Sequence, residues 1–178
     1  RIENIPIRDV DMVFEGGSYV TDGRSTIITT RDCILDVHRN PEIDEKTAEN
    51  ILLKNIGGNK ILWLDHGFHH DETGGHVDNV CFFADEGTMF VASNAERSNP
   101  NFERAQEALD AIQTHYLGVN HRLKIIELPL PQPLEITESE ARDFSSADGT
   151  IVRETGTPMC ASYANSYVVN GAVMVPKI

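Results

Sequence analysis

The sequence predicts an α/β fold that is built from a repeated ββαβ unit. The first unit has two strands, a helix and a third strand, at residues 11–20, 25–30, 44–55 and 60–64. The same order recurs at residues 77–84, 88–93, 101–117 and 123–128. Self-similarity of this kind is typical of repeat architectures, so we expect the units to be arranged around an axis.

Capping residues and apolar spacing predict the two helices. Asp44 is suited to the N-cap of the first helix, and Gly57 and Gly58 are suited to its end. In the second helix, apolar residues recur at intervals of three and four and predict one stripe packed on a sheet. These residues are Phe102, Ala105, Leu109, Ile112 and Tyr116.

A third unit begins near the C-terminal end of the chain. Strands are expected at 161–169 and 172–176, joined at Asn170-Gly171, a strong signal for a two-residue hairpin turn. We therefore expect residues 1–178 to form one incomplete domain, with units at about 11–65, 76–129 and 160–178. Residues 130–158 form a long excursion that we interpret as a connector, with a lid or subunit contact as the alternative.

Composition limits the classes of partner. A formal net charge of −13 argues against nucleic acids and anionic membranes, and favours a small cationic substrate. No apolar run is long enough to span a bilayer, and three cysteines without framework spacing suggest reduced thiols, so we expect a cytoplasmic protein. A homo-oligomer remains an open alternative.

The candidate site combines a histidine with two carboxylates. His76 and Asp78 follow two glycines and open a predicted strand, on which residues two apart point to the same side. Glu15 stands beside another glycine pair at the corresponding place of the preceding unit. Two carboxylates and an imidazole suit a planar cation such as guanidinium, because carboxylates bind it bidentately and histidine moves protons.

Several blocks along the chain resemble the agmatine deiminase family of the guanidine-modifying superfamily. They are Glu15-Gly16-Gly17-Ser18, Asp22-Gly23, Arg39-Asn40-Pro41, Trp63-Leu64, Gly75-His76-Val77-Asp78-Asn79 and Ala161-Ser162-Tyr163-Ala164-Asn165. The resemblance implies a pentein, or α/β-propeller, of which this chain would be the central portion, about two and a half of five units. It also implies guanidine hydrolysis without a cofactor or metal.

By this resemblance, His76 is the catalytic proton shuttle, and Glu15 and Asp78 are catalytic residues that also bind the substrate nitrogens. Pseudo-symmetry adds Asn165 to the substrate-binding set. Members of the family are roughly twice this length and carry a Trp-x-Arg-Asp segment and a Gly-Gly-Gly-Asn-x-His-Cys segment with the nucleophile. Neither segment occurs here, and Cys33, Cys81 and Cys160 lie in other settings, so we expect the chain to be inactive by itself.

Other interpretations remain open. The same superfamily contains peptidylarginine and arginine deiminases, which act on the same head group. A metal-binding hydrolase is suggested by His66, His69, His70 and His76 among nearby carboxylates. A noncatalytic interaction module is suggested by the absent nucleophile. Glu15 could instead cap nearby backbone N–H groups, and His76 could be a histidine that is satisfied by hydrogen bonds and has no catalytic task.

Overall fold

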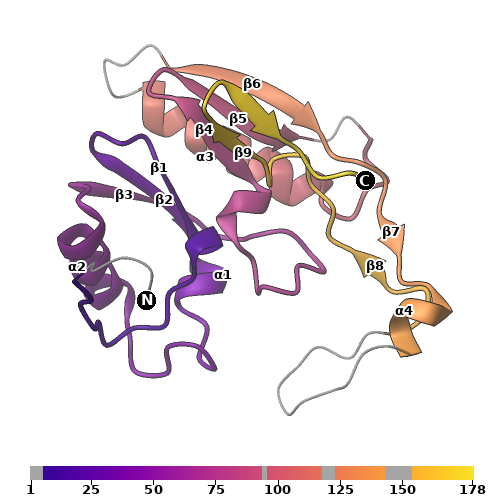
Figure 1. The fold of residues 1–178 in the computed structure, drawn as a ribbon, viewed down its shortest axis with the longest axis horizontal. Coiled ribbons are helices and arrows are strands. Elements are labelled where there is room, and N and C mark those ends of the chain that lie inside the picture. Colours follow the sequence, from indigo (N-terminus) through magenta and orange to yellow (C-terminus); the bar gives the residue numbers. More distant parts are fainter. Residues whose placement is uncertain (1–5, 94–95, 118–122, 143–153) are drawn as a thin grey trace.

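Two three-stranded sheets of identical topology form the framework of the protein in a computed structural model that describes residues 6–93, 96–117, 123–142 and 154–178 (Figure 1). In each sheet the first two strands are antiparallel and the last two are parallel. The first sheet contains β1 (Tyr19–Thr21), β2 (Thr26–Thr30) and β3 (Lys60–Leu64), and the second contains β4 (Cys81–Asp85), β5 (Thr88–Ser93) and β6 (Lys124–Pro129). The observed element order is therefore ββαβ twice.

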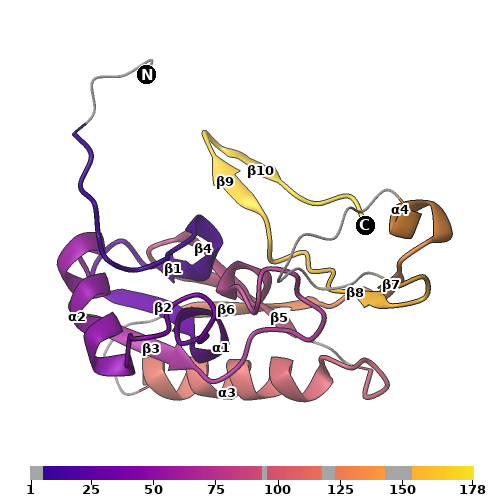
Figure 2. The same ribbon diagram turned by 90° about the horizontal axis from the view of Figure 1, so that it is seen from below.

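A helix joins the parallel strands of each sheet. α2 (Glu45–Ile56) begins at Asp44, whose side chain accepts a hydrogen bond from the Thr47 N–H, and ends at Gly57, whose φ of +96° is readily adopted by glycine. α3 (Phe102–Leu117) lies along one face of the second sheet (Figure 2). Its buried residues, Ala105, Ala108, Leu109, Ile112 and Tyr116, follow the predicted helical stripe.

The main core lies between the two sheets and α3. Ile28 and Leu64 of the first sheet join Met89 and Val91 of the second in one buried cluster with the helix. A smaller cluster joins Ala48 of α2 to Cys33 and Ile34. The shared core fixes the two units against each other, so groups at the ends of their first strands are held in a defined relation.

Three strands differ most from the sequence expectation. The expected strand at 11–20 is ordered as β1 only from Tyr19 and is preceded by a 3-10 turn, η1 (Gly16–Ser18). The expected strand at 77–84 begins as a second such turn, η2 (Val77–Asn79), before β4. The strand expected at 161–169 is reduced to β9 (Tyr167–Val169). A short helix that was not expected, α1 (Arg31–Ile34), follows β2.

The hairpin near the C-terminal end has the expected turn. β9 pairs antiparallel with β10 (Ala172–Met174), and both turn residues have positive φ, 48° at Asn170 and 76° at Gly171. The hairpin extends away from the two sheets, and Tyr167, Val173 and Met174 are exposed (Figure 2).

The excursion at 130–158 is partly ordered. It contains β7 (Leu134–Glu135), which pairs with β8 (Pro158–Met159), and α4 (Glu138–Arg142). Residues 143–153 lie outside the described part, so the excursion's role as connector, lid or subunit contact stays a prediction. The α/β class is confirmed, and the count of propeller units and the domain limits also stay predictions. Within the described residues, no helix is both long and apolar enough to cross a membrane.

The stability of the core can be tested on two residues of α3. Ile112 is fully buried, whereas Leu117 is 87% exposed at the end of the same helix. Ile112→Ala should lower the free energy of unfolding by about 2–5 kcal/mol, because it leaves a cavity. Leu117→Ala should change it by less than about 0.5 kcal/mol. Urea denaturation measures both, and equal effects would contradict the placement of α3.

Candidate functional site

Two 3-10 turns carry the candidate site. Glu15 immediately precedes η1, and His76 immediately precedes η2. Each turn leads into the first strand of its unit, so the two residues hold equivalent positions in successive units. The expectation that His76 and Asp78 open a strand and point to the same side of it was wrong in its local structure, because both lie at the turn η2, before β4 begins. The structure nevertheless brings His76 and Glu15 together.

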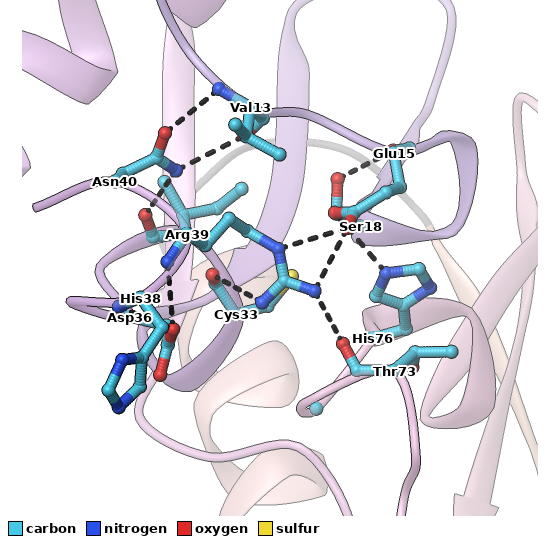
Figure 3. Close-up of polar contacts among 12 residues, drawn as sticks. Val13, Glu15, Ser18, Cys33, Asp36, His38, Arg39, Asn40, Thr73 and His76 are labelled. Carbon is cyan, nitrogen blue, oxygen red and sulfur yellow. Dashed lines mark hydrogen bonds and ion pairs between the residues drawn. The ribbon is translucent and has the colours of Figure 1, made fainter. Parts of the chain in front are cut away.

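The imidazole of His76 faces the carboxylate of Glu15 (Figure 3). Nε2 of His76 lies 3.5 Å from Oε2 of Glu15, and His76 is 8% exposed. An anion and a proton carrier thus lie side by side, and the two atoms that face each other are buried. Such a pair can exchange a proton with a group that lies against both.

Asp78 lies near the Nδ1 side of the His76 ring, where both side chains pack against Gly17. A Cβ atom at Gly17 would overlap Oδ2 of Asp78 and lie only 2.5 Å from Nδ1 of His76. The backbone of η1 is therefore packed directly on both side chains, which is possible only without a side chain at position 17. At Gly16, by contrast, an added Cβ would meet nothing within 4 Å.

Asp71 holds the loop that presents His76. Its Oδ2 accepts hydrogen bonds from the backbone N–H groups of Gly75 and His76, at 3.1 and 2.8 Å. Its Oδ1 accepts from the N–H and the hydroxyl of Thr73. The hydroxyl of Thr30 donates to the carbonyl of Gly75 at 2.5 Å, which ties the loop to the end of β2. These contacts fix the direction of the His76 backbone.

Arg39 holds Glu15. Its Nε and Nη2 both donate to Oε1 of Glu15, at 3.0 and 2.9 Å, and its other bonds reach the carbonyls of Cys33 and Thr73 (Figure 3). Burial is the largest influence and alone would lower the pKa of Arg39, but the hydrogen bonds to Glu15 and the nearby negative groups together outweigh it, so the pKa is raised. The guanidinium engages only one carboxylate oxygen, so the other, Oε2, faces His76.

Each of the three predicted catalytic residues has a buried polar atom without a hydrogen-bond partner among the described residues. These atoms are Oε2 of Glu15, Nε2 of His76 and Oδ1 of Asp78. Burial raises the pKa of the Asp78 carboxyl, an effect that the nearby His76 opposes. Buried polar atoms are normally satisfied, so this arrangement is suited to a ligand that donates hydrogen bonds.

A pocket of about 540 Å³ opens beside Glu15 and Arg39. It is lined by Val13, Glu15, Asp36, His38, Arg39, Glu72, Thr73 and Gly74. Carboxylates from three places in the sequence contribute to its wall. The pocket gives solvent a route to the Glu15 side of the site.

Asn165 is not brought into contact with the other three predicted residues. It is exposed, and its Nδ2 donates to Oδ1 of Asn79 at 3.2 Å. Asn79 follows Asp78 directly, and its carbonyl also accepts a hydrogen bond from the hydroxyl of Ser162. The segment around Asn165 therefore borders the site and meets it through Asn79.

The histidines suggested for a metal site do not converge as that interpretation requires. His66 pairs with Asp32 at 3.2 Å, and the backbone N–H of His69 donates to Asn101. Among the described residues, the one group of three side chains with ligand atoms close enough for a metal, within 4.8 Å of one another, is Glu15, Cys33 and His76.

None of the three thiols has the character of a nucleophile. Burial raises the pKa of Cys33, Cys81 and Cys160 to about 12 in each case. The thiolate is the reactive form, so each group is almost entirely unreactive near pH 7.

Sequence reasoning missed Arg39, Asp71 and the contact of Gly17. Arg39 was visible as part of a characteristic block, but nothing in the sequence indicated that it would bind Glu15, 24 positions away. Asp71 was visible only as one acid in a polar loop. Both residues position the site through hydrogen bonds, and Arg39 also lines the pocket beside Glu15.

Comparison with known proteins finds relatives over nearly the whole chain. Agmatine deiminase of Medicago truncatula is 37% identical over 177 residues, which are 99% of this chain and 47% of that protein. Agmatine deiminase of Pseudomonas fluorescens is 36% identical over 165 residues, 93% of this chain and 45% of that protein. The chain thus spans about half the length of the curated relatives it matches.

A solved structure of agmatine deiminase from Enterococcus faecalis superposes with a TM-score of 0.86 at 33% identity, covering 96% of this chain and 46% of that one. The sequence profile of one family matches the chain throughout, over residues 1–178. The chain belongs to the Porphyromonas-type peptidyl-arginine deiminase family, and its curated relatives include agmatine deiminases.

Proposed function

We propose that the protein containing this chain hydrolyses the guanidine group of agmatine to N-carbamoylputrescine and ammonia. One observation carries the proposal. The buried imidazole of His76 has a carboxylate on each side, with Glu15 near Nε2 and Asp78 near Nδ1. The names of the relatives support the choice of agmatine.

The carboxylates are suited to hold a guanidinium ion. Such an ion presents N–H donors in one plane, and charge-assisted hydrogen bonds to carboxylates are stronger than neutral ones. Oε2 of Glu15 and Oδ1 of Asp78 are buried acceptors without a hydrogen-bond partner within the described part of the chain. Arg39 already shows that Glu15 binds a guanidinium, on its other oxygen.

His76 would move the protons. In the proposed reaction a cysteine, supplied from outside this chain, attacks the guanidinium carbon and forms a covalent intermediate. His76 protonates the departing ammonia and then takes a proton from the water that releases the product. A largely buried ring with two carboxylates close by is placed to serve both steps.

A second candidate is deimination of peptidyl arginine, which the description of the matching family favours. Arginine and agmatine offer the same head group, so Glu15, His76 and Asp78 do not discriminate between them. The noncatalytic module and the metal-dependent hydrolase predict no cysteine-dependent release of ammonia.

Ammonia release from agmatine, free arginine and a peptidyl-arginine substrate distinguishes these functions. We expect the complete protein to act on agmatine with the highest kcat/KM. The isolated 178-residue chain should give no turnover, because its thiols are protonated. Absence of turnover with every guanidine, in the complete protein, would refute the proposal.

The role of His76 predicts a loss of rate when the ring is removed. His76→Gln should lower kcat by about 10²–10⁴-fold, the range typical of a general acid–base residue. His38→Gln is the matched control, because His38 is exposed and lies in the wall of the neighbouring pocket. Steady-state kinetics on both variants make the test. Equal rates in His76→Gln and the unaltered protein would show that this ring transfers no proton.

Two adjacent glycines test the geometry of the site. Gly17→Ala forces the new methyl group against His76 and Asp78, and a shift of about 1 Å can cost about 10²-fold in rate. Gly16→Ala adds the same group in open space and should leave kcat/KM nearly unchanged. Circular dichroism checks that both variants fold. If the two alanines have the same effect on kcat/KM, the contact described at Gly17 does not control the site.

A further inference from the structure

Three different donor groups meet at the inner side of the site. They are the carboxylate of Glu15, the thiol of Cys33 and the imidazole of His76, with ligand atoms that all lie within 4.8 Å of one another. Cys33 comes from α1, whereas the other two residues precede the 3-10 turns. Oxygen, nitrogen and sulfur donors together are characteristic of zinc coordination.

The spacing of two of these donors already fits a tetrahedral ion. Oε2 of Glu15 and Nε2 of His76 lie 3.5 Å apart. Two ligands at about 2.0–2.1 Å from a tetrahedral zinc ion are separated by about 3.3 Å. Zinc–sulfur bonds are longer, about 2.3 Å, so a modest approach of Cys33 completes the set.

Glu15 and His76 each have a neighbouring side chain on the side away from the proposed ion, as metal ligands normally do. Arg39 donates two hydrogen bonds to Oε1 of Glu15 and leaves Oε2 for an ion. Nδ1 of His76 lies beside Asp78 at Gly17, which leaves Nε2 for the same ion. Second partners of this kind orient the ligands and strengthen their binding.

Burial and charge are also consistent with an ion. Cys33 is fully buried, and His76 is 8% exposed with its Nε2 unpartnered among the described residues. The thiol gives up its proton when a metal binds, and a thiolate with a carboxylate balances the charge of a divalent cation. The 540 Å³ pocket beside Glu15 provides a route of entry.

We propose that Glu15, Cys33 and His76 bind Zn²⁺, with water in the fourth position, and that the bound ion inhibits the protein. The ion would occupy Oε2 of Glu15 and Nε2 of His76, the two atoms that the reaction needs. Zinc binding is independent of the proposed function, whereas inhibition rests on it. The ion takes no part in the proposed reaction.

Binding is tested on the reduced 178-residue chain by calorimetry with Zn²⁺ and by absorption spectroscopy with Co²⁺. We expect one ion per chain and a thiolate-to-cobalt charge-transfer band. Cys33→Ser should abolish the band, and Cys33→Ser and His76→Gln should each weaken zinc binding by about a hundredfold or more. Cys160→Ser is the control, because Cys160 is a free cysteine outside the three-residue group.

Because Cys33 lies in the core, folding of each variant is checked by circular dichroism, and Glu15→Gln provides a second test that leaves the thiol intact. Glu15→Gln should weaken zinc binding while it keeps the cobalt band. The proposal is overturned if zinc does not bind, if Cys160→Ser removes the cobalt band, or if folded Cys33→Ser and His76→Gln bind zinc as tightly as the unaltered chain.

Inhibition is tested on the complete protein with agmatine as substrate. Zinc should inhibit competitively, and a chelator should restore the rate. Cys33→Ser, compared with its own rate in the presence of a chelator, should need about a hundredfold more zinc for the same fractional inhibition. Equal zinc sensitivity of Cys33→Ser and the unaltered protein would refute the inhibitory role. If no guanidine is turned over, the proposed function fails, and the binding measurements still decide whether the metal site exists.

Discussion

The candidate site depends on the close packing of the η1 backbone against His76 and Asp78. Gly17 allows this contact because it has no side chain, and the contact brings the first unit onto the second at the point where both present their polar groups. A bulkier residue would separate Glu15 from the imidazole. The core that Ile28 and Leu64 share with the second sheet also holds the two units in this arrangement.

Charge is arranged around this contact in a definite order. Arg39 neutralises one side of Glu15 and is held in turn by the carbonyls of Cys33 and Thr73. Among the described residues, the Asp71 side chain accepts its hydrogen bonds from the loop that carries His76, so it holds that loop in place. Oε2 of Glu15 and Nε2 of His76, which have no hydrogen-bond partner among the described residues, lie 3.5 Å apart. Arg39 thus occupies Oε1 of Glu15 and leaves Oε2 beside His76.

Much of this architecture could be predicted because its signals are local. The cap at Asp44, the stripe on α3 and the turn at Asn170-Gly171 depend on residues close in sequence, and all three are present in the structure. The starts of the first strands were misjudged for a physical reason. In η1 and η2 a hydrogen bond closes within three residues, from Ser18 N–H to the Glu15 carbonyl and from Val80 N–H to the Val77 carbonyl. Apolar patterning over so few residues does not distinguish such a turn from extended chain.

The parts of the site that escaped prediction depend on contacts between distant residues. Arg39 reaches Glu15 across 24 positions, and Cys33 reaches the same place from a helix too short to leave a periodic signal. The pseudo-symmetry of the units suggested that Asn165 lies on the first strand of the third unit, but β9 begins only at Tyr167. The repeated topology was enough to predict that the two turns lie near each other. Which side chains meet there depends on contacts formed only in the folded core.

Burial of the three thiols has a practical consequence for chemical labelling. Alkylating reagents attack the thiolate, and the pKa of about 12 at Cys33, Cys81 and Cys160 leaves almost none of it at neutral pH. Iodoacetamide would therefore leave Cys33, Cys81 and Cys160 nearly unmodified under native conditions. A cysteine that reacts at neutral pH would have to lie outside these three positions, so mass spectrometry could locate the nucleophile of the proposed reaction without any mutation.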